Sequence, residues 1–208
     1  MESEKMVEYY DGVIRHAVRT TKEDSRRPLQ KFFDDLPKDA FAKWITTAKR
    51  PVLAHGDYRP NNLMHRNRKD GTLDIRILDL QTMLSSTPVI DFLYFIFTGS
   101  DEEFRAQYYD QLIDHYYTQL HDAMKRLHLD LANIYSRQDF DNELKETLPF
   151  GLAIAVFTLP IVTVDVENAP KVNKDLDLTD FSITATNDLY TERLNGVVND
   201  YVKWGILK

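Results

Sequence analysis

One stretch of the sequence gathers the polar side chains that phosphoryl transfer uses. It reads Val52-Leu-Ala-His-Gly-Asp-Tyr-Arg-Pro-Asn-Asn-Leu-Met64, and Ile77-Leu-Asp-Leu-Gln81 follows it. Phosphoryl transfer needs a carboxylate to orient and deprotonate the attacking hydroxyl, and oxygen ligands for the magnesium that neutralises charge on the phosphate. Asp57, Asn62 and Asp79 supply these groups. The stretch therefore holds the residue types of a phosphotransfer site.

The residues also occur in the order that such a site requires. His55, Asp57 and Asn62 fill a catalytic loop of the form H-x-D-x-x-x-x-N, and an aspartate follows beyond a predicted hairpin. His-Gly-Asp alone is a weak signal, because a Gly-Asp pair is common turn chemistry and Asp57 could merely cap a loop. A catalytic site is favoured because four further residues lie at matching spacings: Asn62, Asp79, Gln81 and Asp91.

The elements that hold this loop are predicted from periodicity. Apolar residues recur at helical spacing over 6–18 and 29–36, and Pro37 is expected to set the first turn of another helix to Ile45. Three short runs favour strands, at 52–54, 63–64 and 75–80, with a Lys-Asp-Gly turn at 69–71. The pattern predicts a small β element, set among helices, that carries the loop.

Beyond Pro88 the chain is predicted to be helical. An apolar run over 89–97 comes first, and Ser100 with Glu103 matches a capping box at the start of a long helix to Leu127. Further helices are expected over the ranges 139–147, 150–164 and 187–204, with a polar connection over 165–180. The expected fold class is α+β and mainly α-helical.

Composition limits the classes of function. The chain has 208 residues, of which 43% are hydrophobic, and a net charge of -7, so we expect one soluble globular domain and no nucleic-acid partner. It has no cysteine, so any metal must bind through oxygen or imidazole. No apolar leader and no Asn-x-Ser/Thr site occurs, which favours a cytoplasmic location. The apolar run 150–164 is shorter than the roughly 18 residues of a span and contains Pro160, so we expect a buried helix.

Three motifs carry a resemblance to a known family. HGDYRPNNLM, ILDLQ and SSTPVIDFLYFI resemble the CHK kinase-like family, also called ecdysteroid kinase-like, of the choline kinase and aminoglycoside phosphotransferase branch of the protein-kinase-like fold. The resemblance extends to FGLAIAVFTLPIV and YTERLNGVVNDYV near the end of the chain. It implies that residues 1–208 form a single domain, the C-terminal lobe of such a kinase. The catalytic core would lie at about 50–98.

The resemblance also implies a role for each motif residue. Asp57 would be the catalytic base, and Asn62 with Asp79 would bind Mg²⁺ and thereby ATP. Asp91 would brace the catalytic loop and His55 would hold its backbone. The family usually has tryptophan two residues after the catalytic aspartate, where this chain has Arg59. We hypothesise that Arg59 contacts the γ-phosphate, as a basic residue at this position often does in protein kinases.

The smaller lobe of a two-lobed kinase is expected to be missing. That lobe brings a glycine-rich loop over the phosphates and a lysine paired to a helical glutamate. The seven glycines are scattered and form no such cluster, so a fragment, a truncated gene model, a splice form and a shortened protein all fit. The chain alone is expected to transfer little phosphate.

Two functions therefore stay open. The first is an ATP-dependent kinase for a small hydroxylated acceptor, with an ecdysteroid-like sterol suggested by the resemblance alone. The second is a non-catalytic remnant that binds a ligand or partner. A metal-dependent phosphohydrolase is a more distant third, since the same ligands would permit it. The sequence does not indicate the oligomeric state.

Other polar and aromatic groups have structural explanations. Five further histidines show no zinc spacing and are expected at the surface: His16, His65, His115, His121 and His128. Asp175, Asp177 and Asp180 resemble a calcium loop but lack its glycine and glutamate, so a solvated connection is favoured. Six aromatic residues could line an apolar acceptor pocket, although core packing is favoured for most: Phe92, Tyr94, Phe95, Phe97, Phe150 and Phe157.

Overall fold

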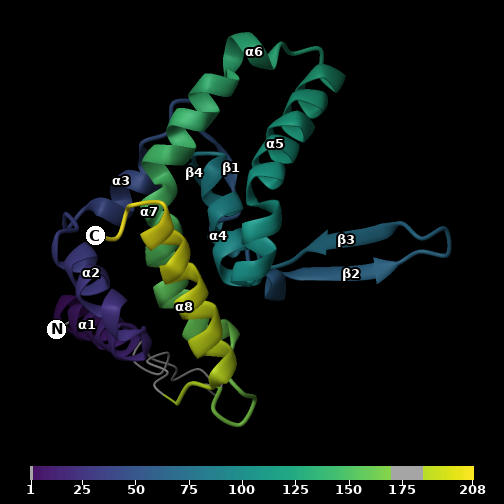
Figure 1. Cartoon of the computed structure of the whole chain (residues 1–208). Helices are drawn as coiled ribbons and strands as arrows, with labels where there is room; N and C mark the ends of the chain where they lie inside the picture. Colours follow the sequence, from purple (N-terminus) through teal and green to yellow (C-terminus); the bar gives the residue numbers. More distant parts are fainter. Residues whose placement is uncertain (1, 170–184) are drawn as a thin grey trace. The chain divides into compact units, whose positions relative to one another are not determined.

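The computed structural model of the chain describes residues 2–169 and 185–208, and it is mainly helical (Figure 1). The possible calcium loop at Asp175, Asp177 and Asp180 lies outside the described residues. The helices are α1 (Glu2–Thr20), α2 (Glu23–Asp34), α3 (Ala40–Thr46), α4 (Val89–Gly99), α5 (Glu102–Arg126), α6 (Leu131–Ile134), α7 (Arg137–Val162) and α8 (Asp188–Lys203). The prediction of a mainly helical α+β chain is confirmed.

The chain divides into two compact units. One contains residues 1–37 and 152–208, and the other contains residues 38–151. The predicted catalytic core at about 50–98 falls within the second unit. That the chain forms a single domain stays a prediction.

The first unit packs α1 and α2 against α8 and the end of α7. The buried stripe of α1 consists of Tyr9, Val13 and Ala17, which recur every four residues. The predicted stripe included Met6, Val7 and Tyr10, but these side chains are exposed, so the buried face is shifted toward Tyr9. The Asn195 amide oxygen accepts a hydrogen bond from Lys22 N at 2.8 Å and ties α8 to the start of α2.

The second unit contains all of the described strands. They are β1 (Val52–Ala54), β2 (Leu63–Asn67), β3 (Leu73–Ile77) and β4 (Leu84–Ser86), with short 3₁₀ turns η1 (Pro60–Asn62) and η2 (Leu80–Thr82). β1 pairs antiparallel with β4, and β2 pairs antiparallel with β3 in a separate hairpin. A strand lies in each of the three predicted regions, but the third covers 73–77 and not 75–80, while β4 and α6 were not predicted. The catalytic loop, residues 55–62, follows β1, ends in η1 and leads into β2.

Two predicted helix starts are wrong. Asp101 caps α5, because its side chain accepts from Phe104 N, whereas the Ser100 hydroxyl donates back to Ile96 O in α4. Pro37 precedes α3, which begins at Ala40. Asp101 and Ser100 are both good capping residues, so the sequence alone does not decide between them.

The two helices predicted at 139–147 and 150–164 are one helix, α7. Pro149, which cannot donate the helical hydrogen bond, lies between the two predicted ranges. The helix continues through it with Thr147, Phe150 and Leu152 buried, so apolar packing outweighs the lost hydrogen bond. Among the described helices, α7 is long and apolar enough to cross a membrane, but 56% of that window is buried inside the protein. Core helices pass the same test, so this is weak evidence of a span.

Candidate active site

The backbone of the catalytic loop turns sharply at Gly56. This residue has a φ of 82°, in the left-handed region that glycine adopts without strain. A Cβ atom placed there would lie 2.4 Å from Leu84 Cδ2 and 2.5 Å from Thr82 O. Glycine is therefore required at position 56 both for its backbone angle and for the close approach of β4 and η2.

Asp91, in the first turn of α4, holds the loop from the other side. Its Oδ2 accepts a hydrogen bond from His55 N at 2.6 Å, and its Oδ1 accepts one from Gly56 N at 2.9 Å. A carboxylate that accepts two backbone N–H groups makes strong, charge-assisted hydrogen bonds. Asp91 thus makes the contacts that the predicted bracing role requires.

His55 connects the loop to the segment after β3. Its ring is buried, and its Nε2 lies 2.8 Å from Leu78 O while its Nδ1 accepts from Asp57 N at 3.3 Å. These two partners place the ring proton on Nε2, because only an N–H can donate to the carbonyl. The His55 carbonyl also accepts from the Thr82 hydroxyl at 2.9 Å. The predicted role of His55, to hold the loop backbone, agrees with these contacts.

The Asp57 carboxylate is the centre of the site. Tyr94 Oη donates to its Oδ1 at 2.6 Å, and Asn62 Nδ2 donates to its Oδ2 at 2.9 Å. Arg59 Nε also donates to Oδ2, at 3.1 Å, and the two side chains are 24% and 20% exposed. Three donors therefore fix the orientation of a carboxylate that remains partly open to solvent.

Asn62 is buried, and its amide orientation leaves an oxygen for a ligand. Nδ2 donates both to the Asp57 carboxylate and to Asp57 O, at 2.8 Å. The amide oxygen then faces away from these acceptors, and it has no hydrogen bond within residues 2–169 and 185–208. An oxygen of this kind suits a hard cation such as Mg²⁺.

Asp79 lies next to Asn62 across the hairpin base. Leu78 N donates to Asn62 O at 2.9 Å, which brings the residue before Asp79 opposite Asn62. Asp79 has a φ of 60° and a ψ of 56° and is exposed, and its side chain makes no hydrogen bond or ion pair in the described part of the chain. A left-handed conformation costs a residue with a side chain about 1–2 kcal/mol. Such strain is frequent at functional sites.

The oxygens of Asn62 and Asp79 suit magnesium better than a metal whose ligands all come from the protein. No group of three or more His, Asp or Glu residues within the described ranges could hold a metal ion. Mg²⁺ usually takes one or two protein oxygens and completes its shell with water and phosphate oxygens. The amide oxygen of Asn62 and the carboxylate of Asp79 would provide two such oxygens.

Burial raises the pKa of two tyrosines near the loop, Tyr58 and Tyr116. The pKa of Tyr58 is raised above its usual value of 10.0, first by burial and then by the negative charge of Asp91. Burial, followed by the charges of Asp91 and Tyr58, raises the pKa of Tyr116 to about 12. Tyr116 uses its hydroxyl to donate to Pro88 O at 2.9 Å, directly before α4. These tyrosines therefore act as hydrogen-bond donors or packing groups at neutral pH.

Sequence reasoning did not find the role of Tyr94 or of Thr82. Tyr94 was considered only as a pocket or core residue, because it lies in a nearly all-apolar run. It follows Asp91 by three residues, so both side chains project from one face of α4 toward the loop. That spacing was the available signal. Phe92 and Phe97 pack around Tyr109 in the core, which leaves half-buried Phe95, 5.5 Å from Tyr58, beside the loop.

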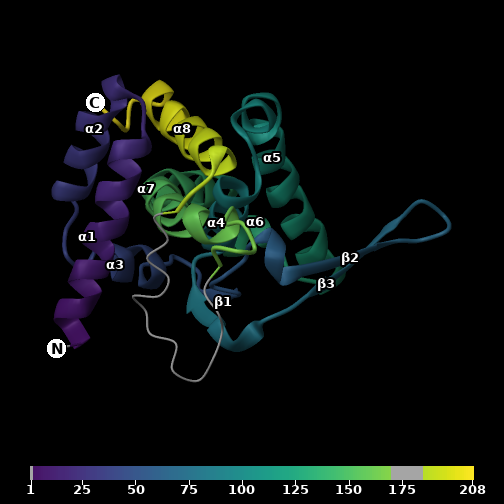
Figure 2. The same cartoon turned by 90° about the horizontal axis from the view of Figure 1, so that it is seen from below.

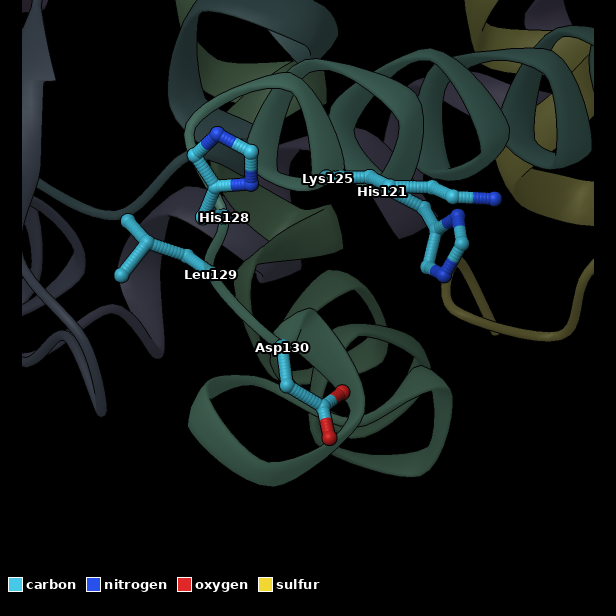
Figure 3. Close-up of a pocket in the computed structure, with 5 residues that line it drawn as sticks. All are labelled: His121, Lys125, His128, Leu129 and Asp130. Carbon is cyan, nitrogen blue, oxygen red and sulfur yellow. The ribbon is translucent and has the colours of Figure 1, made fainter.

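A separate depression of about 470 Å³ lies where α5 meets α6 (Figure 3). It is lined by His121, Lys125, His128, Leu129 and Asp130. The view shows the two imidazoles on different sides of the helix end, and the Asp130 carboxylate caps Ala132 N at 3.1 Å. These side chains do not converge on one point. The depression therefore lacks the geometry of a ligand site.

The expectation of surface histidines is wrong for His16. Its ring is half-buried, stacks on Tyr190 at 5.5 Å and lies 3.1 Å from the Thr186 hydroxyl. Burial, and then the positive charge of Arg19, lower the pKa of His16 below 6.5. The other four histidines are exposed.

Comparison with known proteins gives one match. The sequence model of the ecdysteroid kinase-like family matches residues 3–129, which include the catalytic loop, the hairpin and α4. This family has a kinase-like fold. No curated protein and no solved structure matches the chain.

Proposed function

Because the chain belongs to the ecdysteroid kinase-like family, we propose that it is an ATP-dependent phosphotransferase that acts on a hydroxyl group of a small molecule. Membership implies a small-molecule kinase-like phosphotransferase. ATP as the donor, magnesium as the metal and the identity of the acceptor are parts of our proposal. A cytoplasmic location, where magnesium and ATP are plentiful, belongs to the same proposal.

One observation carries this proposal: the Asp57 carboxylate is oriented by two side chains within a braced loop. Tyr94 Oη donates to it at 2.6 Å and Asn62 Nδ2 at 2.9 Å. A general base must be fixed within hydrogen-bonding reach of the hydroxyl that it activates. In this mechanism, the acceptor oxygen attacks the γ-phosphorus of ATP and Asp57 takes the proton of the hydroxyl. The bond from the γ-phosphorus to the bridging β–γ oxygen breaks, and ADP leaves.

Magnesium would be held by the Asn62 amide oxygen and the Asp79 carboxylate. When bound, the metal neutralises charge on the transferring phosphate. Asn62 also orients Asp57 through Nδ2, at 2.9 Å, so one buried side chain would position both the base and the metal. Loss of Asn62 is therefore expected to affect both turnover and nucleotide binding.

The acceptor is proposed to be a largely apolar alcohol, with an ecdysteroid-like sterol as the first candidate. Tyr58 and half-buried Phe95 lie side by side next to Asp57, with ring centroids 5.5 Å apart. Aromatic rings beside a carboxylate can bind the apolar body of a substrate while its hydroxyl reaches the base. This arrangement supports an acceptor with an apolar surface, such as a sterol.

The contact between Arg59 and Asp57 favours a second candidate, a non-catalytic binding protein. The guanidinium occupies an oxygen that a hydroxyl substrate needs. In an active enzyme Arg59 must leave Asp57 when the phosphate arrives. In a non-catalytic protein the pair would persist with ligand bound.

Transfer of labelled γ-phosphate to a panel of sterol and small alcohol acceptors tests the proposal. The wild type, Asp57→Asn and Asp79→Ala are compared in a complete two-lobed protein, because the chain alone is expected to transfer little phosphate. Magnesium-dependent binding of ATP is measured by calorimetry. We expect Asp57→Asn to lower transfer by about 10²-fold or more while ATP still binds. Asp79→Ala is expected to weaken ATP binding in magnesium. Transfer that survives Asp57→Asn would contradict the role of Asp57 as the base, whereas ATP binding without transfer by the wild type would support the non-catalytic alternative.

A further inference from the structure

The hairpin of β2 and β3 projects from its unit with an apolar face exposed to solvent. Figures 1 and 2 show its tip extending beyond the helices of the same unit. Leu73, Ile75 and Ile77 on β3 are 53%, 48% and 50% exposed. An isolated two-stranded hairpin is at best marginally stable in water and needs further strands or a packing partner. No other residue in the described part of the chain covers this apolar surface of the hairpin.

The outer edge of β3 is free to pair with another strand. Leu78 N donates to Asn62 O at 2.9 Å, so these two residues form a hydrogen-bonded pair of the ladder. Hydrogen-bonded and non-hydrogen-bonded pairs alternate along an antiparallel ladder. Ile77, Ile75 and Leu73 consequently direct their N–H and C=O groups away from β2. An exposed edge of this kind, with alternating apolar residues and no proline, is a template for strand addition.

The sequence of β3 is complementary to itself. It reads Leu-Asp-Ile-Arg-Ile, and an antiparallel pairing centred on Ile75 sets Leu73 opposite the partner's Ile77. The same register sets Asp74 opposite the partner's Arg76, on the other face of the sheet. Apolar residues thus meet apolar residues, and opposite charges meet each other.

The charges on the hairpin leave Arg76 available for this contact. Asp74 pairs within its own chain with Arg66 at 2.9 Å and Arg68 at 3.2 Å. Arg76 makes no ion pair within residues 2–169 and 185–208. The partner's Asp74 is the carboxylate that this register brings to Arg76.

We propose that the chain forms a twofold symmetric dimer through antiparallel pairing of β3 with β3 of a second copy. The two hairpins would form one four-stranded sheet whose two central strands carry Leu73, Ile75 and Ile77 on one face. A twofold interface uses the same surface on both subunits, and the self-complementary pattern of β3 meets that condition. A second copy is favoured over another partner because a different strand would have to match both the apolar and the charged register.

The mass of the chain in solution tests this dimer. Sedimentation and light scattering up to roughly 100 µM cover the micromolar affinities of small interfaces. We expect a concentration-dependent species of twice the 24.3 kDa chain mass. Ile75→Lys is expected to be monomeric, whereas Leu127→Lys, at a side chain 67% exposed at the end of α5, is the matched control and keeps the dimer. A monomeric wild type, or a dimer that survives Ile75→Lys, would overturn the proposal.

A charge exchange gives a second test that does not depend on a single variant. Asp74→Arg alone and Arg76→Asp alone each place like charges opposite each other, so each is expected to be monomeric. Mixing the two variants restores opposite charges at both positions and is expected to produce a heterodimer. The folding of each variant is checked by circular dichroism. A mixture that stays monomeric while the wild type dimerises would show that the interface lies elsewhere.

Discussion

Tyr94 Oη lies 2.6 Å from Asp57 Oδ1 and donates a hydrogen bond to it. One turn earlier on the same helix, Asp91 accepts two backbone hydrogen bonds from the catalytic loop. α4 therefore fixes both the backbone of the loop and the direction of its carboxylate. This makes the position of the proposed base depend on a helix that is buried in the core at Val89, Leu93 and Phe97.

Replacing Tyr94 with phenylalanine removes this donor and keeps the ring. A hydrogen bond to a charged group contributes about 1.5–3 kcal/mol, so we expect a loss of about 1.5 kcal/mol in the free energy of unfolding. Turnover is expected to fall further than stability explains, because Asp57 loses a fixed orientation. Urea denaturation and single-turnover transfer measure the two effects. Tyr108→Phe, at an exposed position on α5, is the control and is expected to change neither.

Asp91→Ala is expected to destabilise the protein by about 3 kcal/mol, because two partly buried backbone N–H groups lose a charged acceptor. Asp91→Asn keeps one acceptor oxygen and is expected to lose roughly half as much. Chemical denaturation of both variants provides the measurement, with the exposed Asp110→Ala on α5 as the control. Equal stability of Asp91→Ala and the control would contradict the bracing role.

Local patterns account for the parts of the fold and site that the sequence predicts. His55, Asp57 and Asn62 lie within eight residues of each other, so one loop brings them together. The long helices follow from periodicity that many residues repeat, and α5 ends within one residue of its predicted limit.

The features that were missed depend on contacts between distant segments. β4 has only three residues and pairs with β1, about thirty residues earlier, so no local pattern marks it. The hydroxyl of Tyr94 acquires its partner only when α4 packs beneath the loop. Pro149 predicts a helix end locally, and tertiary packing overrides it.

Gly56 and Gly71 offer a matched pair for testing the turn of the catalytic loop. Both have a φ of 82°, but a Cβ at Gly56 would overlap Leu84 and Thr82 whereas nothing lies within 4 Å of one at Gly71. Gly71→Ala is expected to cost about 1 kcal/mol from the backbone angle alone. Gly56→Ala adds displacement of β4 and η2, and we expect at least about 2 kcal/mol more. Thermal unfolding of both variants measures the difference. Equal losses of stability would mean that β4 and η2 move at no cost to make room for the added methyl group.

His16 makes the stability of the first unit depend on pH. Burial and Arg19 lower the pKa of His16 in the folded protein below the 6.5 of the unfolded chain. The unfolded state therefore takes up a proton first as the pH falls. The contribution of His16 to stability is expected to be fully present above pH 6.5. It is expected to decline as the pH falls toward the lower pKa that His16 has in the folded protein. Thermal unfolding between about pH 7.5 and about pH 5 measures this decline. His16→Gln is expected to reduce this decline in stability. The control His115→Gln, at an exposed histidine, is expected to leave the decline unchanged.

Arg59 provides the sharpest test of whether the site is catalytic. Its Nε lies 3.1 Å from Asp57, and in the proposed reaction it moves to the γ-phosphate and releases the base. Removal of one donor to a developing charge costs about 10²-fold in turnover, so Arg59→Ala is expected to lower kcat by about that factor with little change in KM for ATP. Arg59→Lys keeps the charge but not the planar geometry and is expected to recover part of the loss. Steady-state kinetics of the two variants give the split between kcat and KM. A rise in KM with kcat unchanged would show that Arg59 contributes to ground-state binding alone, and the proposed contact in the transition state would be wrong.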